Sequence, residues 1–330
     1  MERGCKRPEC TVAQTGKCAL NRDPNQCDER LPQTNALSAN AVSIDAQTAL
    51  LVRPPEKPKL PNSQTLDLNQ MREIAATTQA KLIGVLGSPD SGKTAALVST
   101  YLLLAHNKLS GFTYAYSKTL LAFDEISRGA RRWKGGTKPE QMTVHTEVSA
   151  DRGPGFMHLR LLDTKGQTSD LLIPDLPGEW TDSLVDNNRT DRWTFLKSAD
   201  LLCIFVDGRQ LATQRQYTAH RTKLLIQRLA TLVSPSNPPV VIAVTHRDQL
   251  EPNTATVDQL VAEAARYGLS CNVISIASFT NNSSKTPAGF GIPALIGLWI
   301  NPPSPPPQHF WPDVSSPSGD RMMLQYRNRE

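Results

Sequence analysis

Residues 87–94 read Gly-Ser-Pro-Asp-Ser-Gly-Lys-Thr, which is a complete G-x-x-x-x-G-K-[ST] pattern. An apolar run, residues 82–86, comes before it, and a stretch typical of a helix follows. The glycines let backbone N–H groups turn toward a phosphate, Lys93 adds a positive charge, and the Thr94 hydroxyl suits Mg²⁺. The following helix aims the positive end of its dipole at the same anion. The pattern therefore predicts a phosphate-binding loop, and its candidate contacts are Gly87, Asp90, Ser91, Gly92, Lys93, Thr94 and Ala95.

The rest of the composition limits the class of protein. A formal net charge of +5 over 330 residues favours an anionic ligand but gives no strong footprint for nucleic acid. No apolar segment follows Met1, and the apolar run at residues 201–206 is too short to span a bilayer. We therefore expect a cytoplasmic protein with neither a membrane nor a nucleic-acid partner.

The first 30 residues differ from the rest because they hold four of the six cysteines. A segment this short cannot bury a hydrophobic core, and four thiols in a cytoplasmic module suit a structural Zn²⁺ ion. Two disulfides remain the alternative. We predict a zinc module at 1–30, a Pro-rich linker at 31–64 and a Pro-rich mobile tail at 301–330. The candidate zinc ligands are Cys5, Cys10, Cys18 and Cys27.

Between these segments, residues 65–300 alternate between strand-like and helix-like patterns. Strands are expected at 80–86, 155–163, 168–175, 201–206, 239–245 and 270–277, and helices at 94–108, 189–198, 211–232, 255–267 and 291–300. Residues 112–142 read as a basic connection, and the chain directly after Asp175 reads as irregular. The alternation predicts an α/β fold with a doubly wound, mostly parallel sheet and an antiparallel hairpin at its edge.

A second motif follows the predicted hairpin. Asp175-Leu176-Pro177-Gly178 stands at the carboxyl end of a predicted strand, where ligands bind in open α/β sheets. Asp175 suits a Mg²⁺ ion held through a water, and Gly178 lets its N–H approach a terminal phosphate closely. Taken alone, the motif reads equally well as a turn; after a phosphate loop it predicts a second phosphate contact.

Two later strand ends carry residues that suit a purine base. Thr245-His246-Arg247-Asp248 ends in a carboxylate that can accept hydrogen bonds from guanine N1–H and its 2-amino group, neither of which adenine offers. A helix-capping role for Asp248 is the alternative. Ala277 and Ser278 are small residues at the last strand end, where a backbone N–H could reach the guanine O6. Together, Thr245, His246, Asp248, Ala277 and Ser278 are candidate base contacts.

In this order the motifs resemble those of the Ras-like, translation-factor-related (TRAFAC) GTPases, over residues 80–300. The cysteine-rich amino terminus joined to such a domain is similar to bacterial double-GTPase proteins. The resemblance implies GTP or GDP as ligand, with Mg²⁺ held by Thr94 and Asp175 and the γ-phosphate sensed by Gly178. It also implies a protein partner, either another GTPase or an effector, in a conflict or defence system.

Two positions depart from the family pattern. His246 stands where relatives carry a lysine whose stem covers the base, and an imidazole could stack there instead. Glu179 stands where many relatives place the glutamine that orients the attacking water. With Lys93 and Glu179 as the catalytic candidates, we expect slow GTP hydrolysis. The alternative is a nucleotide-gated scaffold with little or no turnover.

Other family positions stay open at the level of sequence. Thr137, Thr143 and Thr146 are equal candidates for the Mg²⁺-ligating threonine of the first switch. Arg128, Arg131 and Arg132 are candidates for an arginine finger, and a solvated basic surface is the alternative for each.

Overall fold

The computed structural model describes residues 5–7, 9–18, 20–31, 64–131, 153–251, 253–280 and 285–302. The chain divides into two compact units, residues 1–58 and 59–330. The predicted linker at 31–64 and tail at 301–330 fall almost entirely outside the described residues.

The cysteine-rich unit is closed by contacts between its two ends. Cys5 and Arg30 form an isolated β-bridge, the Arg7 guanidinium pairs with Glu29, and helix α1 (Val12–Thr15) lies between them in sequence. All four cysteines of the unit line one small cavity, and no disulfide joins any of the described cysteines. The predicted zinc site is not supported, because no three His, Cys, Asp or Glu side chains among the described residues group closely enough to ligate one ion.

The larger unit is built on one sheet, which has seven strands within the described residues, in the order β2-β3-β4-β1-β5-β6-β7. The strands are β1 (Lys81–Leu86), β2 (Phe112–Tyr116), β3 (Phe156–Asp163), β4 (Thr168–Pro174), β5 (Leu201–Asp207), β6 (Val240–Thr245) and β7 (Cys271–Ser275). Strands β4, β1, β5, β6 and β7 pair in parallel, whereas β2–β3 and β3–β4 are antiparallel. Every residue of β5 and β6 is buried, as expected for parallel strands covered on both faces.

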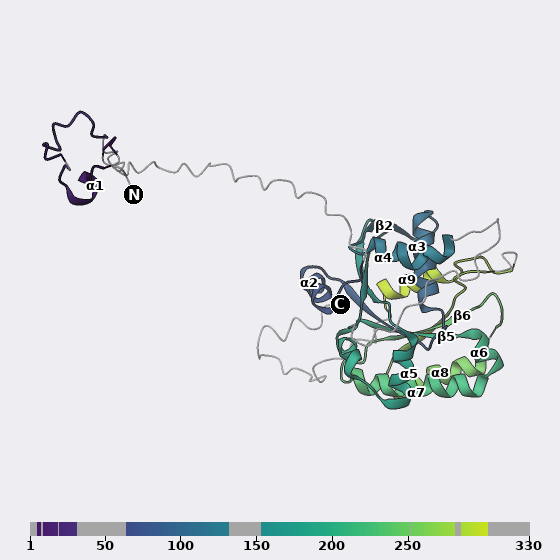
Figure 1. Ribbon diagram of the computed structural model, residues 1–330. Helices are drawn as coiled ribbons and strands as arrows, with labels where there is room; N and C mark the ends of the chain where they lie inside the picture. Colours follow the sequence, from purple (N-terminus) through teal and green to yellow (C-terminus); the bar gives the residue numbers. More distant parts are fainter. Residues whose placement is uncertain are drawn as a thin grey trace, which may run out of the picture. The chain divides into compact units, whose positions relative to one another are not determined.

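Helices cover both faces of this sheet (Figure 1). One layer holds α3 (Lys93–Ala105), α4 (Leu120–Ile126) and α9 (Ile292–Ile300), whose apolar residues share a core with one sheet face. The other holds α2 (Leu68–Thr77), α5 (Gly178–Asn187), α7 (Arg215–Val233) and α8 (Thr254–Arg266). Three shorter helical segments complete the unit: η1 (Ser127–Arg131), η2 (Asp191–Ser198) and α6 (Gly208–Thr213). The predicted doubly wound α/β fold is confirmed.

Several elements differ from the expectation, among them helix α4, which lies within the stretch read as a basic connection. The antiparallel hairpin is present as β3–β4, but it is not the sheet edge, because β2 pairs with β3 on its outer side. Four of the five residues of β2 are exposed, so the strand lacks the buried alternation that marks strands in sequence. Helix α5 begins within the stretch expected to be irregular, and residues 191–198 form a 3-10 helix rather than an α-helix.

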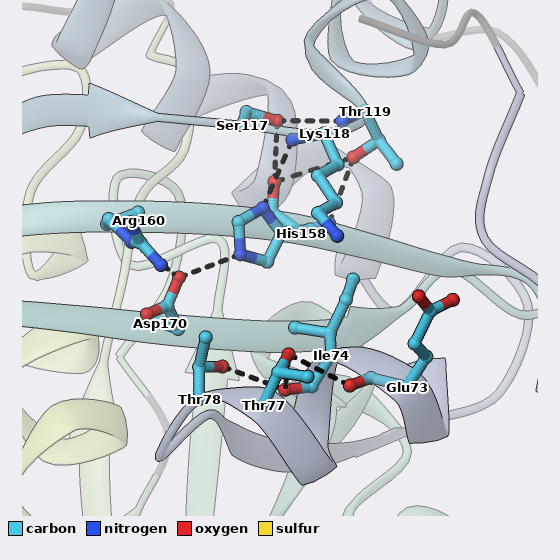
Figure 2. Close-up of polar contacts among 10 residues, drawn as sticks. All are labelled: Glu73, Ile74, Thr77, Thr78, Ser117, Lys118, Thr119, His158, Arg160 and Asp170. Carbon is cyan, nitrogen blue, oxygen red and sulfur yellow. Dashed lines mark hydrogen bonds and ion pairs between the residues drawn. The ribbon is translucent and has the colours of Figure 1, made fainter. Parts of the chain in front are cut away.

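A buried polar cluster ties the hairpin to the turn after β2 (Figure 2). The backbone N–H of Lys118 donates to His158 Nδ1 (3.1 Å), and His158 Nε2 lies 2.8 Å from Asp170 Oδ1. Because Nδ1 accepts, Nε2 carries the ring proton and donates it to the carboxylate. Burial lowers the pKa of His158, whereas the hydrogen bonds from Arg160 and His158 outweigh burial and lower the pKa of Asp170. The cluster is therefore a neutral imidazole between a backbone amide and an Asp170–Arg160 ion pair.

Within the described residues, no helix combines the length and apolar character needed to cross a membrane.

Candidate nucleotide-binding site

The phosphate loop follows β1, which lies between β4 and β5 at the point where the strand order reverses. Ligands of open α/β sheets bind in the crevice at such a point. The glycines of the phosphate loop are required sterically. A Cβ at Gly87 would lie 2.5 Å from Ser91 Oγ and 2.7 Å from the Phe205 carbonyl oxygen. Gly92 and Asp90 both have positive φ, of 92° and 58°, so the loop turns sharply before α3 begins at Lys93.

Lys93 is buried within the loop that it follows. Its Nζ donates to the carbonyl oxygens of Gly87 (2.8 Å) and Ser88 (2.9 Å). Burial lowers the pKa of Lys93 to about 8, although the carboxylates of Asp175 and Glu179 oppose the shift. The lysine is thus a poorly solvated cation whose charged form an incoming phosphate would stabilise.

Thr94 and Asp175 meet although they are 81 residues apart in sequence. Thr94 Oγ1 donates to Asp175 Oδ1 at 3.2 Å, which joins the start of α3 to the segment after β4. A hydroxyl and a carboxylate oxygen side by side are the hard oxygen ligands that Mg²⁺ prefers. These two predicted metal ligands therefore fit the ion.

The start of α5 packs directly on the phosphate loop. A Cβ on Gly178 would lie 2.2 Å from the backbone nitrogen of Pro89, so no larger residue fits between them. Two hydrogen bonds continue this contact: the Gly87 N–H donates to Thr181 Oγ1 (3.2 Å), and Ser88 Oγ donates to Asp182 Oδ1 (2.9 Å). A movement of the loop is therefore transmitted to α5.

Arg221 of α7 contacts α5 at the same Asp182 carboxylate. Its guanidinium donates to Asp182 at 2.9 Å and to Asp186 at 2.7 Å. Glu179, in the first turn of α5, is exposed. The predicted catalytic carboxylate is therefore on the surface rather than locked in place by packing.

A pocket of about 440 Å³ lies where the loop, α5 and α7 meet. Its lining includes Ser88, Asp182 and Arg221, together with two buried hydroxyls, Ser91 Oγ and Thr218 Oγ1, that have no hydrogen-bond partner among the described residues. Asp248, the predicted base-reading residue, is not part of its lining.

The predicted base-reading segment packs on the phosphate loop through Thr245. A Cβ on Gly92 would lie 3.1 Å from the methyl carbon of Thr245, and one on Gly208 would lie 2.3 Å from its carbonyl oxygen. The next residue, His246, has a φ of 57°, in the left-handed region. Asp248 is half-buried in the turn that follows.

The last strand end is held beside α3. Ser99 Oγ of α3 donates to the Ser278 carbonyl oxygen at 2.9 Å. The Ala277 N–H already donates to the Phe290 carbonyl oxygen at 2.9 Å, while the Arg247 N–H donates to the Ile276 carbonyl oxygen. The structure thus brings the four motifs to one edge of the sheet, at the carboxyl ends of β1, β4, β6 and β7.

Two charged residues that the motif analysis missed lie at the same edge. Asp207 ends β5 and accepts from the backbone N–H and side chain of Arg209. Their sequence signal is a charged pair at the end of a predicted strand, the position that marks ligand sites in this class of sheet.

Several other predicted residues are not placed in the site. Thr137, Thr143, Thr146 and Arg132 lie outside the described residues. Arg128 lies in η1 and is exposed.

The chain has low similarity to curated proteins and to the solved structures that it matches. No curated protein is similar enough in sequence to match. Among solved structures, the SRb–GTP/SRX complex of the signal recognition particle receptor from Chaetomium thermophilum is 15% identical, with a TM-score of 0.37 over 62% of this chain and 94% of that one. A mammalian signal recognition particle receptor is 12% identical, with a TM-score of 0.36 over 66% of this chain and 100% of that one.

The family comparison is the decisive one. The family model for Double-GTPase 2 matches residues 81–300, which are more than half of the 330 residues and contain every motif described above. The predicted Ras-like GTPase resemblance is therefore confirmed, and GTP binding is the activity that it supports. The chain belongs to the Double-GTPase 2 family.

Proposed function

We propose that this protein is a Mg²⁺-dependent switch that binds GTP, hydrolyses it slowly and regulates a partner protein. The observation that carries the proposal is the hydrogen bond of 3.2 Å between Thr94 and Asp175, beside the packing of Gly178 on Pro89. These contacts connect the metal ligands, the phosphate loop and α5, so the terminal phosphate and α5 are mechanically linked.

Each residue has a role that its position supports. Lys93 and the N–H groups of the loop bind the phosphates. Thr94 and Asp175 would hold Mg²⁺, which offsets phosphate charge when bound. Gly178 senses the γ-phosphate, and loss of that phosphate releases α5 from the loop. Asp248 reads the base.

Titration calorimetry with GTP, GDP and ATP, each with and without Mg²⁺, tests the proposal. We expect GTP and GDP to bind much more tightly than ATP, and Mg²⁺ to strengthen GTP binding. Equal affinity for GTP and ATP would refute the guanine assignment. Tight GTP binding that EDTA leaves unchanged would refute the metal role of Thr94 and Asp175.

A nucleotide-gated scaffold is the second candidate. It is favoured by Glu179, because an exposed carboxylate beside the γ-phosphate repels negative charge and is not fixed to orient water. Phosphate release in a single turnover, measured with and without K⁺, separates the two functions. If the isolated protein continues to release phosphate from GTP, the scaffold function is ruled out.

The partner is inferred from the family alone. Because the chain belongs to a double-GTPase family, we expect another GTPase or an effector protein as partner, in a bacterial conflict or defence system. Co-purification of the chain with a second GTPase in the GTP state, but not the GDP state, is the expected result. Equal recovery in both nucleotide states would argue against a switch.

A further inference from the structure

Three side chains outside the phosphate motifs form one polar cluster at the ends of β5 and β6. The Asp207 carboxylate accepts from Arg209 Nε (3.2 Å) and from an Arg209 terminal nitrogen (2.9 Å). His246 Nδ1 lies 3.2 Å from Oδ1 of the same carboxylate. Only 4% of the Asp207 side chain is exposed, so these partners replace solvent around it.

The cluster fixes which nitrogen of His246 is protonated. A carboxylate can only accept hydrogen bonds, so the facing Nδ1 carries a proton whether the ring is neutral or charged. The contacts of Thr245 support this assignment. Its Oγ1 lies 2.9 Å from Nδ1, and it donates its own hydrogen to the Val206 carbonyl oxygen (3.2 Å). An unprotonated Nδ1 would instead face the lone pairs of Asp207 at 3.2 Å, which is repulsive.

The same cluster balances charge around the site. Arg209 pairs with Asp207 through two nitrogens, and these hydrogen bonds raise the pKa of Arg209. The guanidinium therefore offsets the negative charge of Asp207 at an edge that must accept an anionic nucleotide. The hydrogen bonds from His246 and Arg209 also lower the pKa of Asp207 despite its burial, so it stays ionised.

From this geometry we propose that Asp207 and Arg209 are positioning residues of the nucleotide site. Asp207 holds the His246 imidazole, with Nδ1 protonated, beside the base-reading turn, and Arg209 holds the Asp207 carboxylate in place and offsets its charge. The inference rests on the proposed guanine-nucleotide function. A purely structural role is the competing explanation, because Asp207 also caps α6 by accepting from the Arg209 N–H at 2.8 Å.

The first experiment reads the tautomer of His246 in the nucleotide-free protein. In ¹⁵N-histidine-labelled protein, about two pH units above the ordinary histidine pKa, His246 should show a protonated Nδ1 and His158 a protonated Nε2. The loss of signals in His246→Gln assigns the resonances. In Asp207→Ala, the carboxylate oxygen that faces both His246 Nδ1 and Arg209 is lost, so we expect the fraction of His246 with a protonated Nε2 to rise. His158 and the control Asp163→Asn, in the β3–β4 turn, should not change.

The second experiment measures nucleotide affinity. Asp207→Asn and Arg209→Gln should each weaken GDP binding about tenfold, the loss of one hydrogen bond to a charged group. Arg209→Lys should recover part of the affinity because it keeps the charge. Arg209 has 41% of its side chain exposed, so its variants serve as the test if Asp207→Asn does not fold.

The outcomes are distinct. A His246 tautomer that is unchanged in Asp207→Ala, or GDP affinity that is unchanged in Arg209→Gln, overturns the proposal. Reduced thermal stability with unchanged affinity and tautomer identifies Asp207 as a helix cap only. If the wild-type chain binds no guanine nucleotide, the proposed function fails and the positioning role fails with it. The tautomer measurement then still shows whether Asp207 orients the ring.

Discussion

The two halves of the proposed nucleotide site are built differently. The phosphate half, around β1 and β4, is shaped by glycines and main-chain groups. There is no room for a Cβ at Gly87 or Gly178, and Lys93 donates to main-chain carbonyl oxygens. In the base half, at the ends of β5 and β6, side chains hold one another, as in the cluster of Asp207, Arg209 and His246. A site built from main-chain groups can be recognised from a short run of sequence. A site built from distant side chains forms only when the fold brings them together.

The largest difference between the halves should come from Lys93→Ala. This change removes the cation from a buried anion-binding loop, at a cost of about 3 kcal/mol, or more than 100-fold in affinity for GTP and GDP alike. Calorimetry against the control Lys108→Ala, an exposed lysine just beyond α3, measures the effect. Near-normal affinity would show that the phosphate half does not depend on this lysine.

Asp248→Asn should affect the base half alone. Replacing the acceptor by an amide leaves a guanine donor unpaired, at a cost of about 2 kcal/mol or roughly 30-fold for GDP. Binding of xanthosine diphosphate should improve instead, because its C2 oxygen can accept from the new amide. Competition between the two nucleotides measures the switch, with Asp258→Asn, at an exposed position of α8, as control. An unchanged ratio would show that Asp248 does not read the base; a capping role is not the alternative, because Asn253 caps α8 by accepting from the Ala255 N–H.

Gly178→Ala tests the contact between the phosphate half and α5. The new methyl group would meet the Pro89 nitrogen at 2.2 Å, so α5 must shift away from the loop. We expect GTP hydrolysis to slow about tenfold, an overpacking cost of about 1.4 kcal/mol, with a smaller change in GDP affinity. Gly297→Ala, which adds a methyl group to open space in α9, is the control. If GDP affinity fell by the same factor as the rate of GTP hydrolysis, α5 would not distinguish the two nucleotides.

The smallest effect concerns pH. The pKa of Lys93 is about 8 in the empty site, and bound phosphate raises it, so above pH 8 nucleotide binding takes up a proton. Affinity should therefore fall about fourfold between pH 7 and 8.5. Calorimetry at pH 8.5 in two buffers of different ionisation enthalpy detects the proton. If no proton is taken up, another group carries the positive charge of the phosphate half.

The contrast also explains what could be predicted from the sequence. The doubly wound sheet and the hairpin β3–β4 follow from runs such as residues 240–245, in which every side chain is buried. The edge strand β2 was missed because four of its five residues are exposed, and α5 because it starts at a glycine after a proline. In both cases tertiary contacts outweigh the local pattern.

The candidate site divides in the same way. Residues 87–94 and the later motifs at Asp175 and Asp248 were assigned from sequence, and the structure places them along one sheet edge. Asp207 and Arg209 follow a predicted strand but were not assigned, because their partner His246 is 37 or more residues away and replaces an expected lysine. The cysteine spacing likewise did not translate into a metal-ligating group among the described residues.

The hydrogen bonds from Lys93 to the Gly87 and Ser88 carbonyl oxygens have a thermodynamic consequence. They hold the loop in its curved form before any phosphate arrives, so the conformational entropy of ordering these residues is lost during folding rather than during binding. The phosphate loop should then stay ordered after the nucleotide is released. The protein should therefore pass through an empty state without unfolding, and exchange of nucleotide becomes limited by contacts with the ligand itself.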